Sequence, residues 1–214
     1  SSDLYAITDA LLSFALRPAN WQSYLNGLKM ERVPVYVTTS LKGEVSLKDE
    51  AKAWADEVGA HFVPRQGRGE ERLHNLYEDL IIYTNMGPEI RTEGGRHHFH
   101  LSMAELRIRQ IDSGKGDRFL DAVAATRPVE FLDCTCGLGS DALVASYGLP
   151  RGSCVDAVEA SPLLARVTAW GFSRYVHERR AVTEALRHIH LTYNTYESVL
   201  TSIKDKSYDI IYFD

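Results

Sequence analysis

The sequence predicts an α/β protein whose larger part is a doubly wound, mostly parallel sheet. First, apolar runs of strand length alternate with segments of helical period from residue 126 to the last residue. Second, the first of these runs ends on Asp133 and breaks into a turn that contains Gly137 and Gly139. Third, the next run ends on Glu159, about 20 residues further along the chain. Strands that alternate with helices form a parallel sheet with right-handed crossovers.

We expect residues 1–95 to form a separate, small α+β domain. Its expected elements are a helix over 5–16, a strand over 33–38, a helix capped by Ser46 and ending at Gly59, strands over 61–64 and 79–84, and a hairpin over 91–101 that turns at Gly94 and Gly95. Serine is a favoured N-cap, glycine commonly ends helices, and β-branched or aromatic residues favour strands. Between residues 65 and 72, Arg65 and Arg68 predict a basic loop that either only connects elements or contacts nucleic acid.

Residues 96–214 are expected to form the second domain. Its expected strands span 129–134, 153–159, 189–193 and 208–213, and its expected helices span 140–148, 162–176, 179–187 and 196–203. The last strand runs directly into Asp214, the final residue, so we expect further C-terminal strands of the sheet to be missing from this chain. On the helix over 162–176, Trp170 and Tyr175 are expected to pack rather than to form a stacking platform.

Composition excludes some classes of protein. No apolar run approaches the roughly 18 residues that span a bilayer, and the first residues lack the basic region of a secretory signal. Three cysteines cannot complete a disulfide framework, so we expect a reduced, cytoplasmic protein. The net charge of −5 argues against a nucleic-acid partner, but six Arg and Lys residues between positions 91 and 118 can supply phosphate contacts.

The glycine turn favours one class of cofactor. Thr135 stands where the G-x-G-x-x-G dinucleotide fingerprint has its first glycine. Asp133 would repel a pyrophosphate at this site, whereas it suits a cationic amine. S-adenosylmethionine (SAM) carries such an amine, has a ribose whose hydroxyls Glu159 can bind, and has no phosphate. Electrostatics therefore favour SAM, and an NAD-linked oxidoreductase is the alternative.

Several motifs together resemble a known family. They are Asp133-x-Thr135-x-Gly137-Leu138-Gly139-x-Asp141, then Glu159-Ala160-Ser161-Pro162, then Asp209-Ile210-Ile211-Tyr212-Phe213-Asp214, and upstream Arg107-x-Arg109 followed by Gly114-Lys115-Gly116-Asp117. From about residue 95 onward the chain is similar to the YhiQ-like class I methyltransferases, and the segment 100–109 is closest to an uncharacterised Gram-positive branch. Asp112 and Ser113 depart from the family's G-G-G turn, and the family's Pro-Met-aromatic continuation after the final Asp is absent.

The resemblance implies a Rossmann-like class I methyltransferase fold and roles for individual residues. Characterised members of the family methylate the exocyclic N2 of a guanine in small-subunit ribosomal RNA, with S-adenosylhomocysteine as the second product. Asp133 is expected to face the amino end of SAM, with Thr135, Gly137 and Gly139 in the turn beneath it. The motif that holds the ribose contains Glu159, Ala160 and Ser161, and Lys115 is the expected partner of the methionine carboxylate. Asp214 is expected to begin the catalytic loop and to accept a hydrogen bond from the target amine.

For other residues two interpretations stay open. Asp141 either caps its helix or reaches the ligand, and Asn194 either contacts adenine or forms a turn. Arg107 and Arg109 either contact RNA phosphates or lie on an exposed helix face. We expect no metal site, since Cys134 and Cys136 have no second pair of ligands at suitable spacing. Within His97-His98-x-His100, strand alternation places only 98 and 100 on one face, which favours a solvated or RNA-facing surface.

The motifs therefore predict a protein that binds SAM, and the resemblance implies a methyltransferase whose acceptor is ribosomal RNA. Two other functions remain open at this point. One is methylation of a different acceptor, either a small molecule or a protein. The other is a catalytically inactive SAM-binding protein that uses its N-terminal domain to interact with partners.

Overall fold

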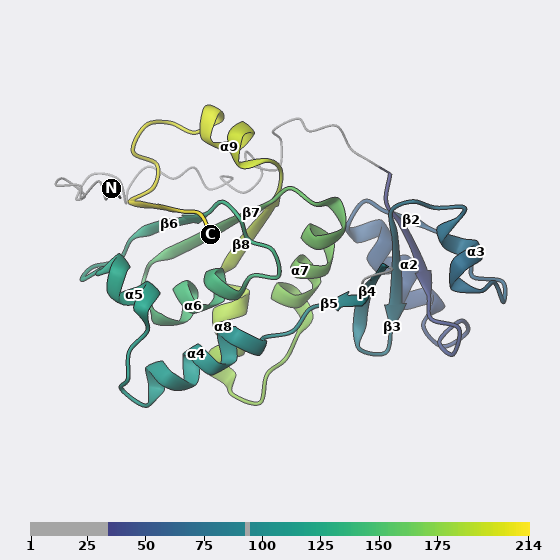
Figure 1. The fold of residues 1–214 in the computed structure, drawn as a ribbon, viewed down its shortest axis with the longest axis horizontal. Coiled ribbons are helices and arrows are strands. Elements are labelled where there is room, and N and C mark those ends of the chain that lie inside the picture. The colour runs from purple at the N-terminus through teal and green to yellow at the C-terminus, as the bar shows by residue number, and fades with distance from the viewer. Residues whose placement is uncertain (1–33, 93–94) are drawn as a thin grey trace.

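The computed structural model describes residues 34–92 and 95–214, which form two sheets. Figure 1 shows the sheets side by side, with helix α7 (Pro162–Arg174) between them. The helix expected over residues 5–16 lies outside the described residues. Within the described part of the chain, no helix combines the length and apolar character needed to cross a membrane.

The N-terminal sheet has five strands in the order β2-β1-β3-β4-β5. Strands β1 (Tyr36–Thr39), β2 (His61–Phe62) and β3 (Leu80–Thr84) are parallel, while β4 (Gly87–Thr92) and β5 (Gly95–His98) are antiparallel to their neighbours. The strands expected over 33–38, 61–64 and 79–84 are confirmed. The expected hairpin is present, but it spans Gly87 to His98 rather than 91–101, and Gly95 lies in β5. Residues 93 and 94 of its turn are not described. Strand β5 extends past residue 95, so the sheet crosses the domain boundary that we expected there.

The N-terminal helices differ in detail from the sequence prediction. Helix α2 (Lys48–Glu57) has Leu47 at its N-cap with no side-chain capping bond, so the expected cap at Ser46 is wrong. The expected loop over 65–72 runs into a short helix, α3 (Glu70–His74). Arg65 is only 3% exposed and donates to the carbonyls of Thr39 and Arg68. A contact between Arg65 and nucleic acid is therefore wrong, because its guanidinium holds the loop in place.

The C-terminal sheet has the expected parallel architecture. Its order is β8-β7-β6-β9, with β6 (Glu130–Asp133), β7 (Cys154–Glu159), β8 (Ile189–Tyr193) and β9 (Ile210–Tyr212) all parallel. The chain builds outward from β6 to β8 and then returns to pair β9 with the other side of β6. The carboxyl ends of β6 and β9 therefore form a topological switch point, where open α/β sheets bind ligands.

The helices of this half fall within two residues of their expected bounds. They are α6 (Ser140–Gly148), α7, α8 (Arg180–Arg187) and α9 (Tyr196–Ser202). Two further helices precede the sheet and were not assigned from the sequence, namely α4 (Ser102–Asp112) and α5 (Arg118–Val123). Helix α5 has only six residues, and α4 buries only Ala104 and Ile108 among its charged residues.

Helix α7 joins the two sheets through close packing. A Cβ on Gly87, at the start of β4, would lie 2.5 Å from the indole ring of Trp170. The Trp170 Nε1–H donates to the Tyr83 hydroxyl at 3.4 Å, which itself donates to Glu50 of α2 at 2.7 Å. Trp170 is thus a packing residue, as the sequence predicts. Close approach of β4 to this indole requires glycine at position 87.

We predict that Gly87→Ala separates this steric constraint from the backbone constraint. Both Gly87 and Gly67 have positive φ, but a Cβ on Gly67 meets nothing within 4 Å. Gly87→Ala should therefore lower the free energy of unfolding by about 1–3 kcal/mol more than Gly67→Ala does. Urea denaturation of both variants checks this. Equal losses of unfolding free energy in the two variants would show that Trp170 moves away from the new methyl group at no energetic cost.

Candidate active site

The glycine turn after β6 forms the floor of the candidate site. Gly137 and Gly139 have φ of +54° and +81°, a backbone conformation that glycine adopts without strain. A Cβ on Gly139 would lie 2.3 Å from the Phe172 ring, so this glycine also allows α6 and α7 to pack closely. A Cβ on Gly137 would meet nothing within 4 Å. The space beside Gly137 is therefore open to a ligand.

Asp133 is the buried carboxylate of the site. It ends β6, is 1% exposed, and accepts a hydrogen bond from the Thr135 N–H at 3.0 Å. Burial raises the pKa of Asp133 to about 7; the Thr135 bond opposes this rise, and the charges of Asp141, Glu159 and Asp214 add to it. A cation bound near Asp133 would stabilise the ionised form of its carboxyl group.

Glu159 links the end of β7 to the glycine turn. Its Oε2 accepts from the Gly137 N–H at 2.8 Å, and its Oε1 accepts from the Ser161 N–H at 2.7 Å. Ser161 caps α7 through its side chain, and Ala160 is exposed between these two residues. The structure thus brings the acidic residue of the second motif directly to the turn of the first.

Asp214 reaches the same edge of the sheet from β9. Its backbone N–H donates to the Thr135 hydroxyl at 3.0 Å, and the Cys134 N–H donates to the Tyr212 carbonyl at 2.9 Å. Asp214 is exposed. The last residue of the chain is therefore held beside the turn that Asp133 begins.

Arg107 has a different position from the one expected. Its guanidinium pairs with both oxygens of Asp117, at 2.8 and 2.9 Å, and also with Asp141. It also lies over the Phe119 ring at 5.4 Å, and its carboxylate partners raise its pKa. Arg107 therefore holds two loops together at the wall of the cleft, and its contact with RNA stays a prediction.

The same ion pairs show that Asp141 is engaged by Arg107, while its contact with the ligand stays a prediction. Its carboxylate lies in the first turn of α6 and makes no capping bond at that N-terminus, where Gly139 is the N-cap. It binds Arg107 instead. Asp117 accepts from the N–H groups of Phe119 and Leu120 and so caps α5. Arg107 thus ties the turn before α5 to the helix that follows the glycines.

A cleft of about 840 Å³ lies beside the glycine turn, which contributes Leu138 to its lining, whereas Asp133 and Glu159 are not among its lining residues. The start of α4, the turn around Lys115, the start of α6 and the end of β9 line it, and its walls include Lys115, Asp141, Tyr212 and Asp214. Arg109 lies outside this cleft on the exposed face of α4, where it pairs with Glu105. It thus fits the exposed-face interpretation.

Asn194 lies at the end of β8, away from this cleft. Its side-chain oxygen accepts from the Thr195 N–H at 2.8 Å, and its backbone N–H donates to the Glu159 carbonyl at 3.1 Å. The side chain is fully buried. These bonds fit the turn-forming interpretation, while a contact with adenine stays a prediction.

Sequence analysis did not single out the aromatic side of the cleft. The Phe119 ring lies 5.0 Å from the Tyr212 ring, and both residues line the cleft. Burial first, and then Asp141 and Asp214, raise the pKa of Tyr212 to about 12. Phe119 stands two positions after Asp117, and a single aromatic residue there does not indicate a ligand site in the sequence. Tyr212 lies inside a quoted motif, but its alternation in β9 is too short to assign a face.

The remaining candidates have structural positions. Cys134 and Cys136 are buried, and burial raises the pKa of both thiols, which fits small packing residues. The rings of His98 and His100 lie 5.5 Å apart, as expected for residues on one face. Among residues 34–92 and 95–214, no group of His, Cys, Asp and Glu could hold a metal ion.

Comparison with known proteins gives three findings. A family profile described as "Putative SAM-dependent methyltransferase" matches residues 96–214. The chain is 27% identical over 180 residues to the uncharacterised protein YpiP of Bacillus subtilis (strain 168), covering 83% of this chain and 70% of YpiP. Its fold is similar to the crystal structure of the SAM-dependent methyltransferase NGO1261 from Neisseria gonorrhoeae, with a TM-score of 0.57, 18% identity, and coverage of 83% of this chain and 68% of NGO1261.

Two alanine variants should separate the roles of the two glycines. Gly139→Ala combines a positive φ with a clash against Phe172, so we expect it to lose about 2–5 kcal/mol of unfolding free energy. Gly137→Ala carries only the backbone strain of about 1–2 kcal/mol, but its methyl group enters the open space. Gly137→Ala should therefore remain folded and bind S-adenosylhomocysteine much more weakly. Thermal melting and calorimetric titration test this; unchanged binding by Gly137→Ala would contradict it.

The raised pKa of Asp133 predicts how ligand binding depends on pH. The ammonium group of S-adenosylhomocysteine favours ionised Asp133, whose pKa in the free protein is about 7. Affinity should therefore rise as pH increases from 6 to 8, by up to about tenfold per pH unit below that pKa, with release of a proton. Titration calorimetry in buffers of different ionisation enthalpy measures both effects.

Asp133→Asn should remove this dependence on pH, whereas the exposed control Asp205→Asn should keep it. The same shift has a consequence for stability. Between pH 3.8 and about 7 the folded protein keeps a proton on Asp133 that the unfolded chain has lost, so this residue lowers the free energy of unfolding as pH rises. A pH-independent affinity in the unmodified protein would contradict the assignment to Asp133.

Proposed function

The chain belongs to the family of SAM-dependent methyltransferases, and from this premise we propose that it methylates the exocyclic N2 of a guanine in small-subunit ribosomal RNA. The main observation in support of a SAM site is that four carboxylates lie close together. Asp133, Asp141, Glu159 and Asp214 come from β6, α6, β7 and β9, and the last three raise the pKa of the first. Such a site favours a cationic ligand and disfavours a pyrophosphate.

The residues of the glycine turn fit SAM. Each Glu159 oxygen accepts one backbone N–H and keeps a further lone pair, so the carboxylate can also accept the two ribose hydroxyls. Asp133 and the open space beside Gly137 suit the amino end, and Lys115 at the rim suits the methionine carboxylate. SAM supplies a methyl group on a sulfonium sulfur. The two ion pairs of Arg107 position the loops on either side of this end.

The acceptor side fits a planar base with an exocyclic amine. Lone-pair density on such an amine is delocalised, so the protein must align the nitrogen and accept its N–H groups. The Asp214 carboxylate, or the carbonyls beside it, can serve as acceptor because Thr135 fixes the backbone of Asp214. Phe119 and Tyr212 give the cleft an aromatic side. We identify Asp214 as the catalytic residue of this proposal.

We further propose two domains, a small α+β domain up to about residue 95 and the methyltransferase domain from 96 onward. The family match begins at residue 96, which supports this boundary, although β5 pairs with the N-terminal sheet. A ribosomal acceptor also implies that the protein acts in the cytoplasm. Arg109 and Arg118 are exposed near the cleft and are available to RNA phosphates.

Methyl transfer from labelled SAM tests the acceptor. The substrates are small-subunit RNA and intact small subunits, both from cells that lack this protein, and nucleoside analysis identifies the product. We expect label in N2-methylguanosine. Label at another RNA position would replace the guanine assignment, and no label in either substrate would refute the RNA acceptor while leaving SAM binding intact. Label in protein or in a small molecule would identify the alternative acceptor.

A variant of Asp214 tests its catalytic role. Asp214→Ala removes the proposed acceptor while keeping the backbone bond to Thr135, so we expect kcat to fall about a hundredfold. The affinity for S-adenosylhomocysteine should change little. Asp205→Ala, a change at another exposed aspartate, serves as the matched control. Equal kcat values for the two variants would contradict the assigned role.

A further inference from the structure

A second pocket lies in the N-terminal domain, at a position that favours ligands. In the order β2-β1-β3, the chain goes from β1 to β2 on one side and then crosses to β3 on the other. The carboxyl ends of β1 and β3 therefore form a second topological switch point. A pocket of about 600 Å³ lies there, between the loop that follows β1 and the turn that joins β3 to β4. This volume is in the usual range for ligand sites.

The floor of this pocket is a charged face of the sheet. Glu89 pairs with His98 and Arg91 pairs with Arg96 across β4 and β5, so these four side chains lie on one face. Helix α2 covers the opposite face, where Tyr83 contacts Trp54 and Glu50. Every residue of β5 is exposed. The charged face is thus open to solvent over β5, while Glu89 of β4 is buried beneath it at 8% exposure.

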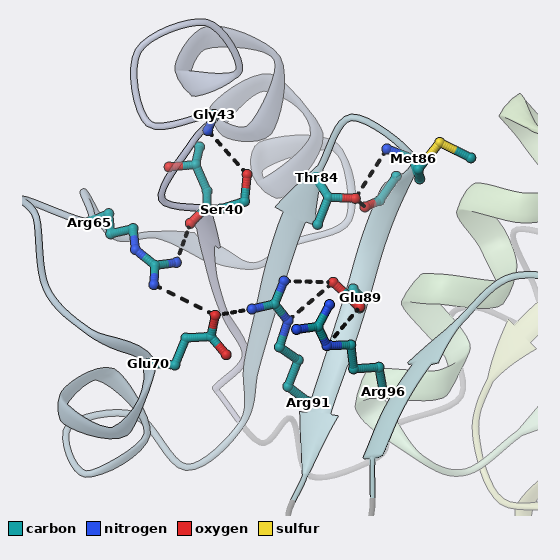
Figure 2. A network of polar contacts seen from close by, with 11 residues as sticks. Ser40, Gly43, Arg65, Glu70, Thr84, Met86, Glu89, Arg91 and Arg96 are labelled. Carbon is teal, nitrogen blue, oxygen red and sulfur yellow. Dashed lines mark hydrogen bonds and ion pairs between the residues drawn. The ribbon is translucent and has the colours of Figure 1, made fainter.

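Arg91 holds two glutamates of the pocket in place, and these two ion pairs neutralise its own positive charge. It pairs with Glu89 at 2.8 Å and with Glu70 at the start of α3, and Arg65 lies 3.9 Å from Glu70 (Figure 2). Both carboxylates raise the pKa of Arg91. The two glutamates are therefore compensated. The cations with the most exposed positions are Lys42 and Arg96, the latter with 66% of its side chain exposed.

The rim of the pocket adds contacts of a different kind. Ser40 and Thr84 supply hydroxyl groups, and Met86 projects from the β3–β4 turn with 81% exposure (Figure 2). A thioether packs favourably against an aromatic ring. Cations, hydroxyls and an exposed thioether together match phosphates and the stacked face of a base.

A short segment connects this pocket to the methyl-transfer cleft. His98 lines the N-terminal pocket, while His100 lines the cleft together with Leu101, Ser102 and Met103. The rings of His98 and His100 lie 5.5 Å apart in an edge-to-face arrangement, and the His100 Nδ1 is 2.9 Å from the Ser102 hydroxyl. Two neighbouring exposed imidazole rings thus connect the lining of one pocket to the lining of the other.

We propose that the single-stranded RNA that carries the methyl acceptor continues from the cleft across His98 and His100 into the N-terminal pocket. Lys42 and Arg96 contact its phosphates, and a flanking base lies against Met86. This proposal rests on the proposed function, because it takes RNA as the acceptor. Single-stranded nucleic acids bind through positively charged grooves combined with rings on which bases stack.

The same residues disfavour a compact anion as the occupant. Three cations and two carboxylates line the pocket, and Glu89 lies beside the arginines. Because Arg91 is engaged by Glu70 and Glu89, a free polyphosphate would depend on Lys42 and Arg96 at the rim. An RNA strand spaces its phosphates, and carboxylates can accept hydrogen bonds from base amino groups. The mixed charge therefore fits nucleotides in a strand better than a small phosphate ligand.

A charge reversal tests the proposal. We predict that the double variant Lys42→Glu/Arg96→Glu binds a labelled single-stranded RNA of about 12 nucleotides roughly tenfold more weakly, with a salt slope reduced by about 1.4 for two lost phosphate contacts. The KM for small-subunit RNA should rise by a similar factor. The kcat and the affinity for S-adenosylhomocysteine should stay unchanged, because neither residue lines the cleft. Fluorescence anisotropy and steady-state kinetics provide these values.

The matched control is Arg151→Glu/Lys204→Glu, which has the same charge change at exposed positions outside both pockets. If both double variants behave alike, general electrostatics explains the effect and the proposal is overturned. If the unmodified protein neither binds nor methylates RNA, the proposed function fails, and this inference fails with it. These two failures are distinguishable, because the first appears only in the variant and the second in the unmodified protein.

Discussion

Repulsion among carboxylates is the constraint on which the candidate site depends. Asp133, Asp141, Glu159 and Asp214 gather at one edge of a parallel sheet, where burial would make four unpaired negative charges prohibitive. The fold deals with each one differently. Arg107 pairs with Asp141, two backbone N–H groups bind Glu159, solvent reaches Asp214, and the raised pKa lets Asp133 keep its proton. Asp133 is thus the carboxylate whose ionised form a bound cation would stabilise most, and in the proposed function the ammonium of SAM is that cation.

The architecture of the sheet was predictable because it depends on local periodicity. The strands of residues 126–214 are short apolar runs between polar helices, and all four were placed within two residues. The pairing of Asp133 with Glu159 was predictable too, because parallel strands end at one edge. Partners of long charged side chains were not predictable. Arg107 reads as an exposed basic residue, and only the fold places two aspartates, 10 and 34 residues away, around it.

Packing against glycine explains why the two sheets act as one support. Trp170 of α7 occupies the space that a side chain at Gly87 would take, and Phe99 packs against Gly171 on the same helix. Arg166 of α7 donates to the carbonyl of Val58, at the end of α2. Each contact joins residues that are far apart in sequence, and the two rings occupy the space that side chains at Gly87 and Gly171 would take. Hydrophobic periodicity does not predict such contacts, since a glycine in the sequence does not indicate which distant side chain packs against it.

Helix α4 lies between the N-terminal sheet and the cleft beside the C-terminal sheet. It follows β5 after three residues, begins in the wall of the cleft, packs on α6 and carries Arg107 in its second turn. The segment between β5 and α4 thus belongs to the N-terminal sheet at one end and to the wall of the cleft at the other. In the proposed function, RNA bound along β5 would lie against the segment that leads into Arg107 and, through its ion pairs, to Asp117 and Asp141.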